Sequence, residues 1–280
     1  MIRKVPLLLL SCVVVGLLST SCSKDMRKFR KYSTKGDIAQ KDSAAFFFYE
    51  RETYDKAGFL FEELLPIYGG RPRAEEVLYH LAYSKYKQKS YLLAAYHFEQ
   101  YSKQYPNNAR AEECLYMVAY CYYTQSDPFY LDQSSTRKAI DQFQYYLVNF
   151  PESERKADAN SYLSELRERL AKKTLEQAYL YYNTEQYKGG VTAFEVFIQE
   201  YPDSRYREEA EFMIFKCTVA LADVSTQRRK KNRYLDALDH YQTFVDRYPD
   251  STYLKDAEAI FSKAKKSLEK ILEDEEDANS

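Results

Sequence analysis

Apolar and polar positions alternate along this chain with the period of an α-helix, in a pattern that recurs five times. Each copy carries a small residue, then large apolar residues four, seven and eleven positions later, then Pro or Gly. These offsets place the side chains on one helix face, and the Pro or Gly ends the helix. The five copies are Ala57, Phe61, Leu64, Tyr68, Gly69; Ala94, Phe98, Tyr101, Tyr105, Pro106; Ala139, Phe143, Tyr146, Phe150, Pro151; Gly190, Phe194, Phe197, Tyr201, Pro202; and Ala237, Tyr241, Phe244, Tyr248, Pro249.

A second helical segment follows each stop. Polar pairs that can cap a helix stand directly after four of the stops: Asn107-Asn108, Glu152-Ser153, Asp203-Ser204 and Asp250-Ser251. Mostly small residues recur eight and fifteen positions after the stops: Val77, Cys114, Ala159, Ala210, Ala257, and Ser84, Cys121, Leu166, Cys217, Ala264. Larger residues lie between them: Leu81, Val118, Leu163, Ile214 and Phe261. The small residues permit close helix approach, so each copy predicts one helical hairpin.

Composition excludes several protein classes. The chain has only seven Gly and eight Pro, which argues against a strand-and-turn architecture, and we predict an all-α fold. The glycines form no G-x-G-x-x-G or G-x-x-x-x-G-K sequence, so nucleotide binding by a Rossmann turn or a P-loop is excluded. The net charge of −1 gives no indication of nucleic-acid binding.

The repeats differ in length, because their stops lie 37, 45, 51 and 47 residues apart. Neither Gly nor Pro lies between Pro151 and Gly189, so we predict one long helix from Ser153 to about Asn183. A loop from Thr124 to Thr136 and a stretch from Asp223 to Arg233 account for the extra length of the other long repeats.

These boundaries divide the chain into five parts. Residues 1–21 form a signal peptide and residues 22–42 a basic tether. Residues 43–151 carry repeats one to three, and residues 152–250 carry the long helix with repeats four and five. Residues 251–280 form a capping helix and an acidic tail; we expect helix over residues 251–272 and disorder over Glu273–Asp277.

The N-terminal segment predicts a lipid anchor. Arg3 and Lys4 precede an apolar stretch, Val5 to Leu18, that is too short to span a bilayer. It ends in Leu18-Ser19-Thr20-Ser21-Cys22, which resembles a bacterial lipobox, so we predict cleavage before Cys22 and acylation of its thiol. Leu9-Leu10-Ser11-Cys12 also fits the pattern, but cleavage there would leave an apolar segment on the mature chain. A plain signal peptide with an incidental Cys22 is the other alternative.

The tether after Cys22 is rich in positive charge. Between Lys24 and Lys35, only Asp25 opposes six cations: Lys24, Arg27, Lys28, Arg30, Lys31 and Lys35. Such a segment suits an anionic lipid surface, and it is equally typical of a solvated linker.

Candidate catalytic and metal-ligating residues are few. His80, His97 and His240 match no metal-ligand spacing, and the last two share one repeat position, which favours a scaffold role. Three cysteines fall on small-residue positions of the repeat, where we expect buried packing thiols: Cys114, Cys121 and Cys217. We therefore predict a non-enzymatic protein with no metal and no cofactor.

The small residue, the aromatic spacing and the Pro stop resemble tetratricopeptide repeats, and the resemblance implies an α-solenoid with a concave surface. The positions that face this surface in such repeats are largely aromatic here: Phe46, Tyr49, Tyr79, Tyr83, Tyr86, Tyr116, Tyr120 and Tyr123. Two interpretations stay open. The residues form a groove for an extended peptide with aromatic side chains, or they only pack between helices.

The layout also resembles the BamD (YfiO) family of outer-membrane lipoproteins. The similar stretches are Leu131-Asp132-Gln133, Glu165-Leu166-Arg167, Tyr181-Tyr182 and Tyr206 to Ala210. The resemblance implies a periplasm-facing, non-enzymatic subunit of the machinery that assembles β-barrel proteins. It implies that the N-terminal repeats bind aromatic C-terminal segments of unfolded clients. It also implies that the C-terminal repeats dock on the BamA barrel subunit, beside other assembly lipoproteins.

One basic run is the candidate docking site: Arg228, Arg229, Lys230, Lys231 and Arg233. The alternative function is a lipid-anchored scaffold for other cell-envelope proteins, of the cell wall or of secretion, with no client groove. An adaptor that recruits an enzyme is a third hypothesis.

Overall fold

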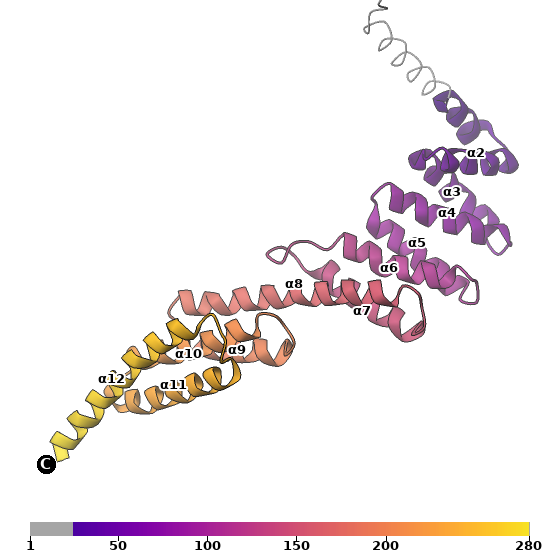
Figure 1. The fold of residues 1–280 in the computed structure, drawn as a ribbon. Coiled ribbons are helices and arrows are strands. Elements are labelled where there is room, and N and C mark those ends of the chain that lie inside the picture. Colours follow the sequence, from indigo (N-terminus) through magenta and orange to yellow (C-terminus); the bar gives the residue numbers. More distant parts are fainter. Residues whose placement is uncertain (1–24, 280) are drawn as a thin grey trace, which may run out of the picture. The chain divides into compact units, whose positions relative to one another are not determined.

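The computed structural model describes residues 25–279, and these residues form helices joined by short connections, without a strand (Figure 1). The predicted signal peptide and Cys22 lie outside the described residues. Residues 25–35 form a first helix. The others are α2 Ile38–Glu50, α3 Tyr54–Tyr68, α4 Arg73–Lys87, α5 Tyr91–Gln104, α6 Ala111–Thr124, α7 Ser134–Asn149, α8 Lys156–Asn183, α9 Tyr187–Glu200, α10 Arg207–Asp223, α11 Gln227–Arg247 and α12 Leu254–Asn279.

The helices form five successive hairpins, α2/α3 to α10/α11, and α12 ends the series. The second helix of each hairpin ends one or two residues before its predicted stop: at Tyr68, Gln104, Asn149, Glu200 and Arg247. The all-α, tetratricopeptide-repeat class predicted from the sequence is therefore confirmed.

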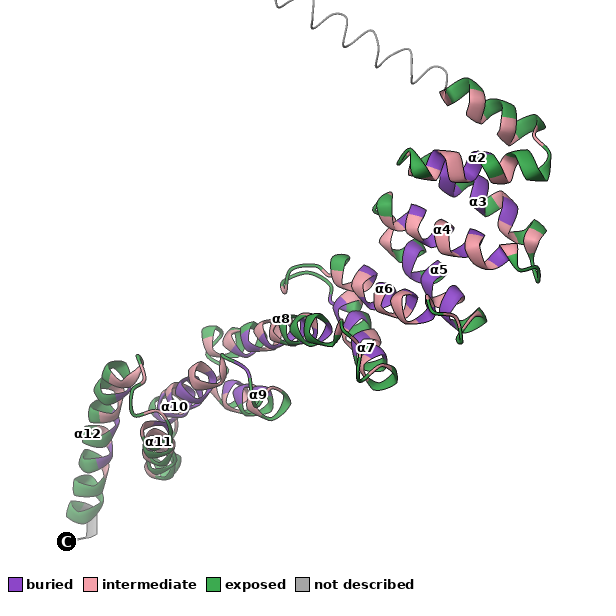
Figure 2. Ribbon diagram, turned by 45° about the vertical axis from the view of Figure 1, so that its right-hand side comes forward, coloured by how far each residue is buried: buried purple, intermediate pink, exposed green. Residues whose placement is uncertain are grey.

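The aromatic stripe of each hairpin is buried against small residues. Phe61, Phe98, Phe143 and Phe194 are completely buried, and Figure 2 shows buried residues on the inner faces of the hairpins. The small positions that follow the stops are completely buried as well: Val77, Cys114, Ala159, Ala210 and Ala257. Burying one large apolar side chain contributes about 1.5–3 kcal/mol, so this packing dominates the stability of each hairpin.

Two compact units share these hairpins. Unit 1 comprises residues up to Ser126 together with Ser134–Leu163, and unit 2 comprises Asp127–Gln133 together with Ser164–Ser280. The division lies inside α8, twelve residues beyond the 151/152 boundary expected from the sequence. The buried positions of α8 continue without a break, from Ala159 and Leu163 in unit 1 to Leu166 and Leu170 in unit 2.

The loop 127–133 belongs to unit 2 because it is fastened to α8. The ammonium group of Lys173 donates a hydrogen bond of 2.6 Å to the carbonyl oxygen of Leu131. The buried amide of Gln133 donates to the carbonyl oxygen of Pro128 at 2.8 Å, which closes the loop on itself.

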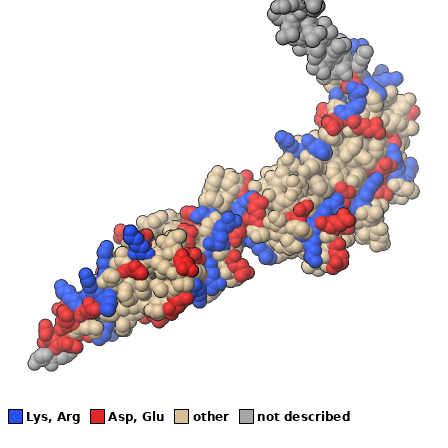
Figure 3. Space-filling model, viewed as in Figure 1, with Lys and Arg blue, Asp and Glu red and all other residues tan. Residues whose placement is uncertain are grey.

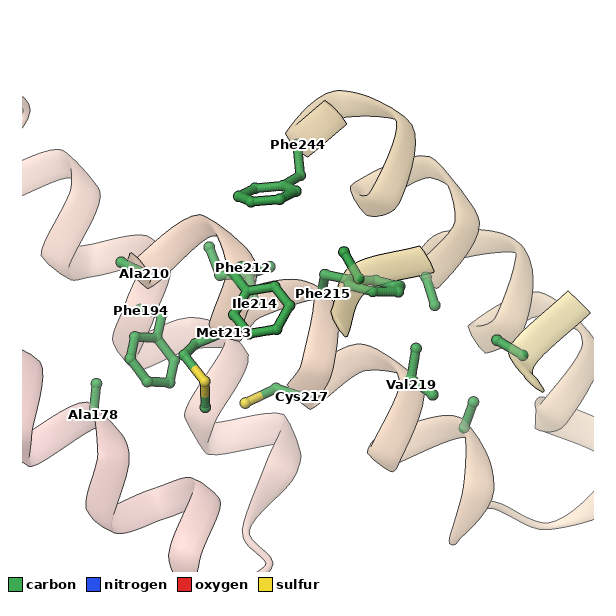
Figure 4. Close-up of a cluster of buried hydrophobic side chains, with 14 of the residues drawn as sticks. Ala178, Phe194, Ala210, Phe212, Met213, Ile214, Phe215, Cys217, Val219 and Phe244 are labelled. Carbon is green, nitrogen blue, oxygen red and sulfur yellow. The ribbon is translucent and has the colours of Figure 1, made fainter. Parts of the chain in front are cut away.

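Unit 2 is packed around α10. Figure 4 shows Phe212, Met213, Ile214 and Phe215 among the buried side chains, together with Phe194. Helix α10 packs against α9, α11 and α12, which explains why consecutive residues of this helix are buried on all its sides.

The C-terminal part of unit 2 corrects one prediction and refines another. Glu273–Asp277, expected to be disordered, belongs to α12. Leu268, which precedes the segment in α12, is buried on the core, and the ammonium group of Lys231 lies 2.6 Å from a carboxylate oxygen of Glu275, at the middle of the segment. Most of the stretch Asp223–Arg233 is helical, because α11 begins at Gln227.

The cysteines on the small-residue positions are free and buried, as predicted: Cys114, Cys121 and Cys217. Burial raises the pKa of the Cys121 and Cys217 thiols to about 12, and it raises the pKa of Cys114 as well. Protonated, buried thiols are poor nucleophiles, so these cysteines act as packing residues.

Replacing Phe143 by Ala should lower the free energy of unfolding by about 3–5 kcal/mol, because it removes a completely buried ring. Tyr145→Ala on the same helix is the matched control, since Tyr145 is 54% exposed and should contribute less than about 0.5 kcal/mol. Chemical denaturation followed by circular dichroism measures both. Equal losses in the two variants would contradict the packing described here.

Candidate functional site

The aromatic residues predicted to face a binding surface lie together in unit 1. Phe46 and Tyr49 come from α2, and the six tyrosines come from α4 and α6. All eight are half-buried. We call them, together with His80 and Tyr162, the aromatic row.

One part of the row is centred on His80. The ring centroids of Phe46 and Tyr49 each lie 4.8 Å from that of His80. Tyr79 lies 5.4 Å from His80 and 4.9 Å from Tyr83. Rings from α2 and α4 are therefore in direct contact, so the first two repeats present one continuous aromatic surface.

The other part of the row is centred on Tyr120. Its ring centroid lies 6.3 Å from that of Tyr86 on α4. Tyr116 and Tyr123, from its own helix, stack on it at 6.0 and 5.8 Å. Tyr162, on α8, approaches Tyr123 to 4.4 Å. The row thus extends from the first helix of repeat one to the first helix of repeat four, within unit 1.

The inner edges of the same rings rest on the core. The ring centroid of Tyr83 lies 4.9 Å from that of buried Phe98, and that of Tyr116 lies 5.5 Å from that of buried Tyr146. Each ring is fixed on one side and leaves part of its surface to solvent. Such rigid, amphipathic side chains lose little conformational entropy when they contact a ligand.

Glu113 on α6 joins α4 to α6 beneath the row. The hydroxyl groups of Tyr79 and Tyr83 donate to its two carboxylate oxygens, at 2.9 and 2.6 Å. Desolvation is the main reason why the pKa of both hydroxyls is raised above the usual tyrosine value, and the acceptor Glu113 adds to it. Desolvation also raises the pKa of Tyr49, to about 12. These hydroxyls are protonated at neutral pH.

His80 is uncharged at neutral pH, because desolvation by burial lowers its pKa below the usual histidine value. Its Nδ1 lies 2.8 Å from the backbone oxygen of Glu76. The row is therefore a neutral surface of rings and hydroxyl groups, without a paired nucleophile and base that would indicate catalysis.

Three arginines border the row at equivalent repeat positions, four residues after each stop. The guanidinium carbons of Arg73 and Arg110 each lie 4.4 Å from a ring centroid, those of Phe46 and Tyr79, and Arg155 lies 5.6 Å from Tyr116. Each is also paired with a carboxylate of the preceding helices: Arg73 with Asp42, Arg110 with Glu75, and Arg155 with Glu113. Cation–π contact of this kind places a guanidinium over the face of each ring.

The basic run of unit 2 occupies the first turns of α11. Arg228 and Arg229 are exposed and Lys230 is half-exposed. Lys231 is paired with Glu275, and Arg233 donates hydrogen bonds to the Ser225 hydroxyl and the Leu221 carbonyl at the end of α10. The five predicted docking residues thus separate into three that face solvent and two that fasten α11 to its neighbours.

Unit 2 also carries an apolar cavity of about 660 Å³ between α8 and α9. Its lining includes Ala178, Tyr181, Ala193 and Val196 and holds no charged residue. Gly189 is required beside it, because a Cβ at this position would lie 2.8 Å from the Tyr181 ring.

Sequence reasoning found the tyrosines but missed several residues that organise them. Tyr162 was missed because it lies one position later in its repeat than Tyr79 and Tyr116. The arginines could have been found, since their distance from the stop is constant in three repeats. The roles of Glu113 and His80 depend on contacts between helices, which no spacing shows.

Figure 3 shows Lys and Arg interspersed with Asp and Glu over both units. Within residues 25–279, no group of His, Cys, Asp and Glu side chains is arranged to hold a metal ion. The same part of the chain has no helix whose length and hydrophobicity would allow it to cross a membrane.

Comparison with known proteins gives a family match. The sequence model of YfiO, described as an outer membrane lipoprotein family, matches residues 41–191 and 172–271. No curated protein matches the chain.

Among solved structures, the chain is similar to the TPR2AB domain of yeast Sti1 in complex with pHSP90. The identity is 14%, the TM-score is 0.38, and the match covers 81% of this chain and 98% of that one. It is also similar to the TPR domain of P58(IPK), at 13% identity and a TM-score of 0.39, over 83% of this chain and 66% of that one.

Replacing Glu113 by Ala should lower the free energy of unfolding by about 1–3 kcal/mol, because two half-buried tyrosine hydroxyls lose their acceptor. Asp158→Ala is the matched control, since Asp158 is an exposed acid in the first turn of α8. Thermal unfolding of both variants is the measurement. If Glu113→Ala were no less stable than the control, Glu113 would not join the two helices as described.

Proposed function

Because the chain belongs to the YfiO family of outer membrane lipoproteins, we propose that it is a non-enzymatic, lipid-anchored subunit of the β-barrel assembly machinery. Cys22 carries the anchor, and the folded repeats face the periplasm. Unit 1 binds the aromatic C-terminal segments of unfolded barrel proteins, and unit 2 docks on the BamA-type barrel subunit of the same machinery, which also holds other assembly lipoproteins.

The observation that carries the client-binding role is the recurrence of half-buried aromatic side chains along the row. Half-buried rings from four successive first helices form two contacting groups, one from Phe46 to Tyr83 and one from Tyr86 to Tyr162. Both groups include tyrosines of α4, and Tyr79 and Tyr83 share the carboxylate of Glu113. An extended peptide needs such a repeated surface, because its side chains recur at regular intervals. Aromatic client side chains gain ring-to-ring contact there.

The bordering arginines support the same proposal. A peptide's terminal carboxylate is a single negative charge, which a guanidinium can bind through two hydrogen bonds. Arg110 is the best placed of the three, because its guanidinium lies 4.4 Å from the Tyr79 ring while its contact with Glu75 is a long one, 3.7 Å. The contact of Arg155 with Glu113 is longer still, 4.0 Å, but its guanidinium lies 5.6 Å from the Tyr116 ring.

The docking role is assigned to the solvent-facing cations of α11, namely Arg228, Arg229 and Lys230. Lys231 and Arg233 are not included in the docking site, because their side chains are engaged within unit 2. Exposed cations on a rigid helix favour an acidic partner surface.

A second candidate function is a lipid-anchored scaffold that has no client surface. It is favoured by the contacts of Tyr83 and Tyr116 with core rings, since a tyrosine that completes the core needs no ligand to explain it. Peptide binding separates the two functions.

Replacing Tyr83, Tyr120 and Tyr123 by Ala should weaken binding of a short peptide with a C-terminal aromatic residue by on the order of tenfold or more. Fluorescence anisotropy with a labelled peptide measures the affinity, and circular dichroism shows whether the helices are kept. The same peptide ending in Ser should bind the unchanged protein as weakly as the aromatic peptide binds the variant.

The matched control is Tyr96, Tyr130 and Tyr145 to Ala, which removes three tyrosines that are 57%, 68% and 54% exposed outside the row. Since the triple variant also loses core contacts, Tyr123→Ala alone is measured beside it. Unchanged peptide affinity in both row variants would exclude the client-binding role and leave the scaffold.

Reversing the charge of Arg228, Arg229 and Lys230 to Glu should reduce co-purification of the barrel subunit from detergent-solubilised membranes, because three attractive contacts become repulsive. The control reverses three exposed cations elsewhere: Arg137, Arg167 and Lys188. Equal recovery of the barrel subunit with both variants would remove α11 from the docking site.

A further inference from the structure

The helix of residues 25–35 is divided lengthwise into two unlike halves. At 3.6 residues per turn, one half of its circumference carries the exposed residues: Met26, Arg27, Arg30, Lys31, Thr34 and Lys35. The other half carries the residues that are not exposed: Asp25, Lys28, Phe29, Tyr32 and Ser33. In Figure 2 this is the green and pink helix that precedes α2.

The inward half is docked on repeat one. Phe29 makes edge-on contacts with Phe48 and Phe59, at ring-centroid distances of 5.9 and 5.6 Å. The ammonium group of Lys28 lies 3.2 Å from the ring centroid of Phe47. Asp25, the single acid of the helix, is paired with Arg51 at 3.5 Å. The helix is thus held by α2 and α3, and its orientation on them is set by aromatic contacts.

The outward half is left with four cations, no acid and one apolar side chain. Arg27, Arg30, Lys31 and Lys35 lie on this half, and Met26 is 45% exposed beside them. The acid of the helix that could neutralise them, Asp25, is on the other side and engaged. A rigid array of like charges is unfavourable unless counter-charges lie opposite it, so the face fits a dense anionic surface.

We propose that the outward face of residues 25–35 is a membrane-binding surface, which docks repeat one on anionic phospholipid headgroups. The position in the chain favours lipid over an acidic protein. Cys22 precedes the helix by three residues, which span at most about 10 Å. The inference rests on the proposed acylation of Cys22, because that acylation would bring the helix of residues 25–35 to the membrane surface. A thiol held in the bilayer keeps the four cations within reach of the headgroups, where each contributes about fivefold to affinity.

The test uses the full mature chain, residues 22–280, with Cys22→Ser, so that no acyl chain, client or partner subunit contributes to binding. Vesicles of phosphatidylcholine, with and without roughly one third phosphatidylglycerol, are the probes. We expect co-sedimentation with the anionic vesicles only, weakening steeply as salt rises from about 50 to about 300 mM.

Replacing Arg27, Arg30, Lys31 and Lys35 by Gln should weaken binding to the anionic vesicles by on the order of a hundredfold or more. The matched control replaces four exposed cations elsewhere by Gln, namely Arg137, Lys156, Arg167 and Lys255, and should bind as the parent does. Phe29→Ala is a second variant: it keeps every charge but removes the docking contact, so it should bind vesicles while losing thermal stability.

Three results would overturn the proposal: equal binding by the parent and the four-Gln variant, equal loss in the control variant, or binding that ignores phosphatidylglycerol. Competition with soluble polyglutamate tests whether the negative charge that this face binds belongs to an acidic protein rather than to phospholipid headgroups. If polyglutamate displaced the vesicles at equal charge concentration, an acidic protein would be the partner instead. Because no client or barrel subunit is present, these outcomes are independent of the proposed assembly function.

Discussion

The packing of each hairpin's aromatic stripe against the small residues of the next hairpin is the interaction on which the rest of the structure depends. A single hairpin has no second surface on which to bury its stripe, so stability is shared between neighbours. The contact is close enough that a Cβ at Gly190 would lie 3.0 Å from the sulfur of Cys217. Polar bonds repeat on the same plan: Ser153 and Ser204, each just after a stop, donate to Glu112 and Glu168 of the preceding repeat.

The aromatic row follows from this packing. A first helix must offer apolar area to the second helix of its own hairpin and to the first helix of the next, and Tyr meets both demands while keeping a polar tip. The rings of unit 1 are thereby ordered before any ligand arrives.

The periodic features of the fold were predictable, because they depend on spacing within a helix. The stops, the buried small residues and the three packing cysteines all repeat with the period of the hairpin. The failures have a common cause. Charge density suggested disorder at Glu273–Asp277, yet one ion pair to Lys231 and the burial of Leu268 hold that segment in α12. Residues 25–35, expected as a charged tether, are likewise held by a few contacts, because Phe29 and Tyr32 pack on the core of repeat one and Lys28 lies on the ring of Phe47.

The site was predictable only in part, for a related reason. Tyrosines at regular positions can be counted along the chain, but Glu113 accepts hydrogen bonds from Tyr79 and Tyr83, which lie 34 and 30 positions earlier, and only folding brings them together.

The continuity of α8 has a consequence for anyone who wishes to dissect this protein. Residues of two different cores lie on one uninterrupted helix. Truncation within α8 would strip one core of Leu163 or the other of Leu166 and expose apolar surface to aggregation. Fragments that are to be studied alone need overlapping ends, each retaining the whole of α8.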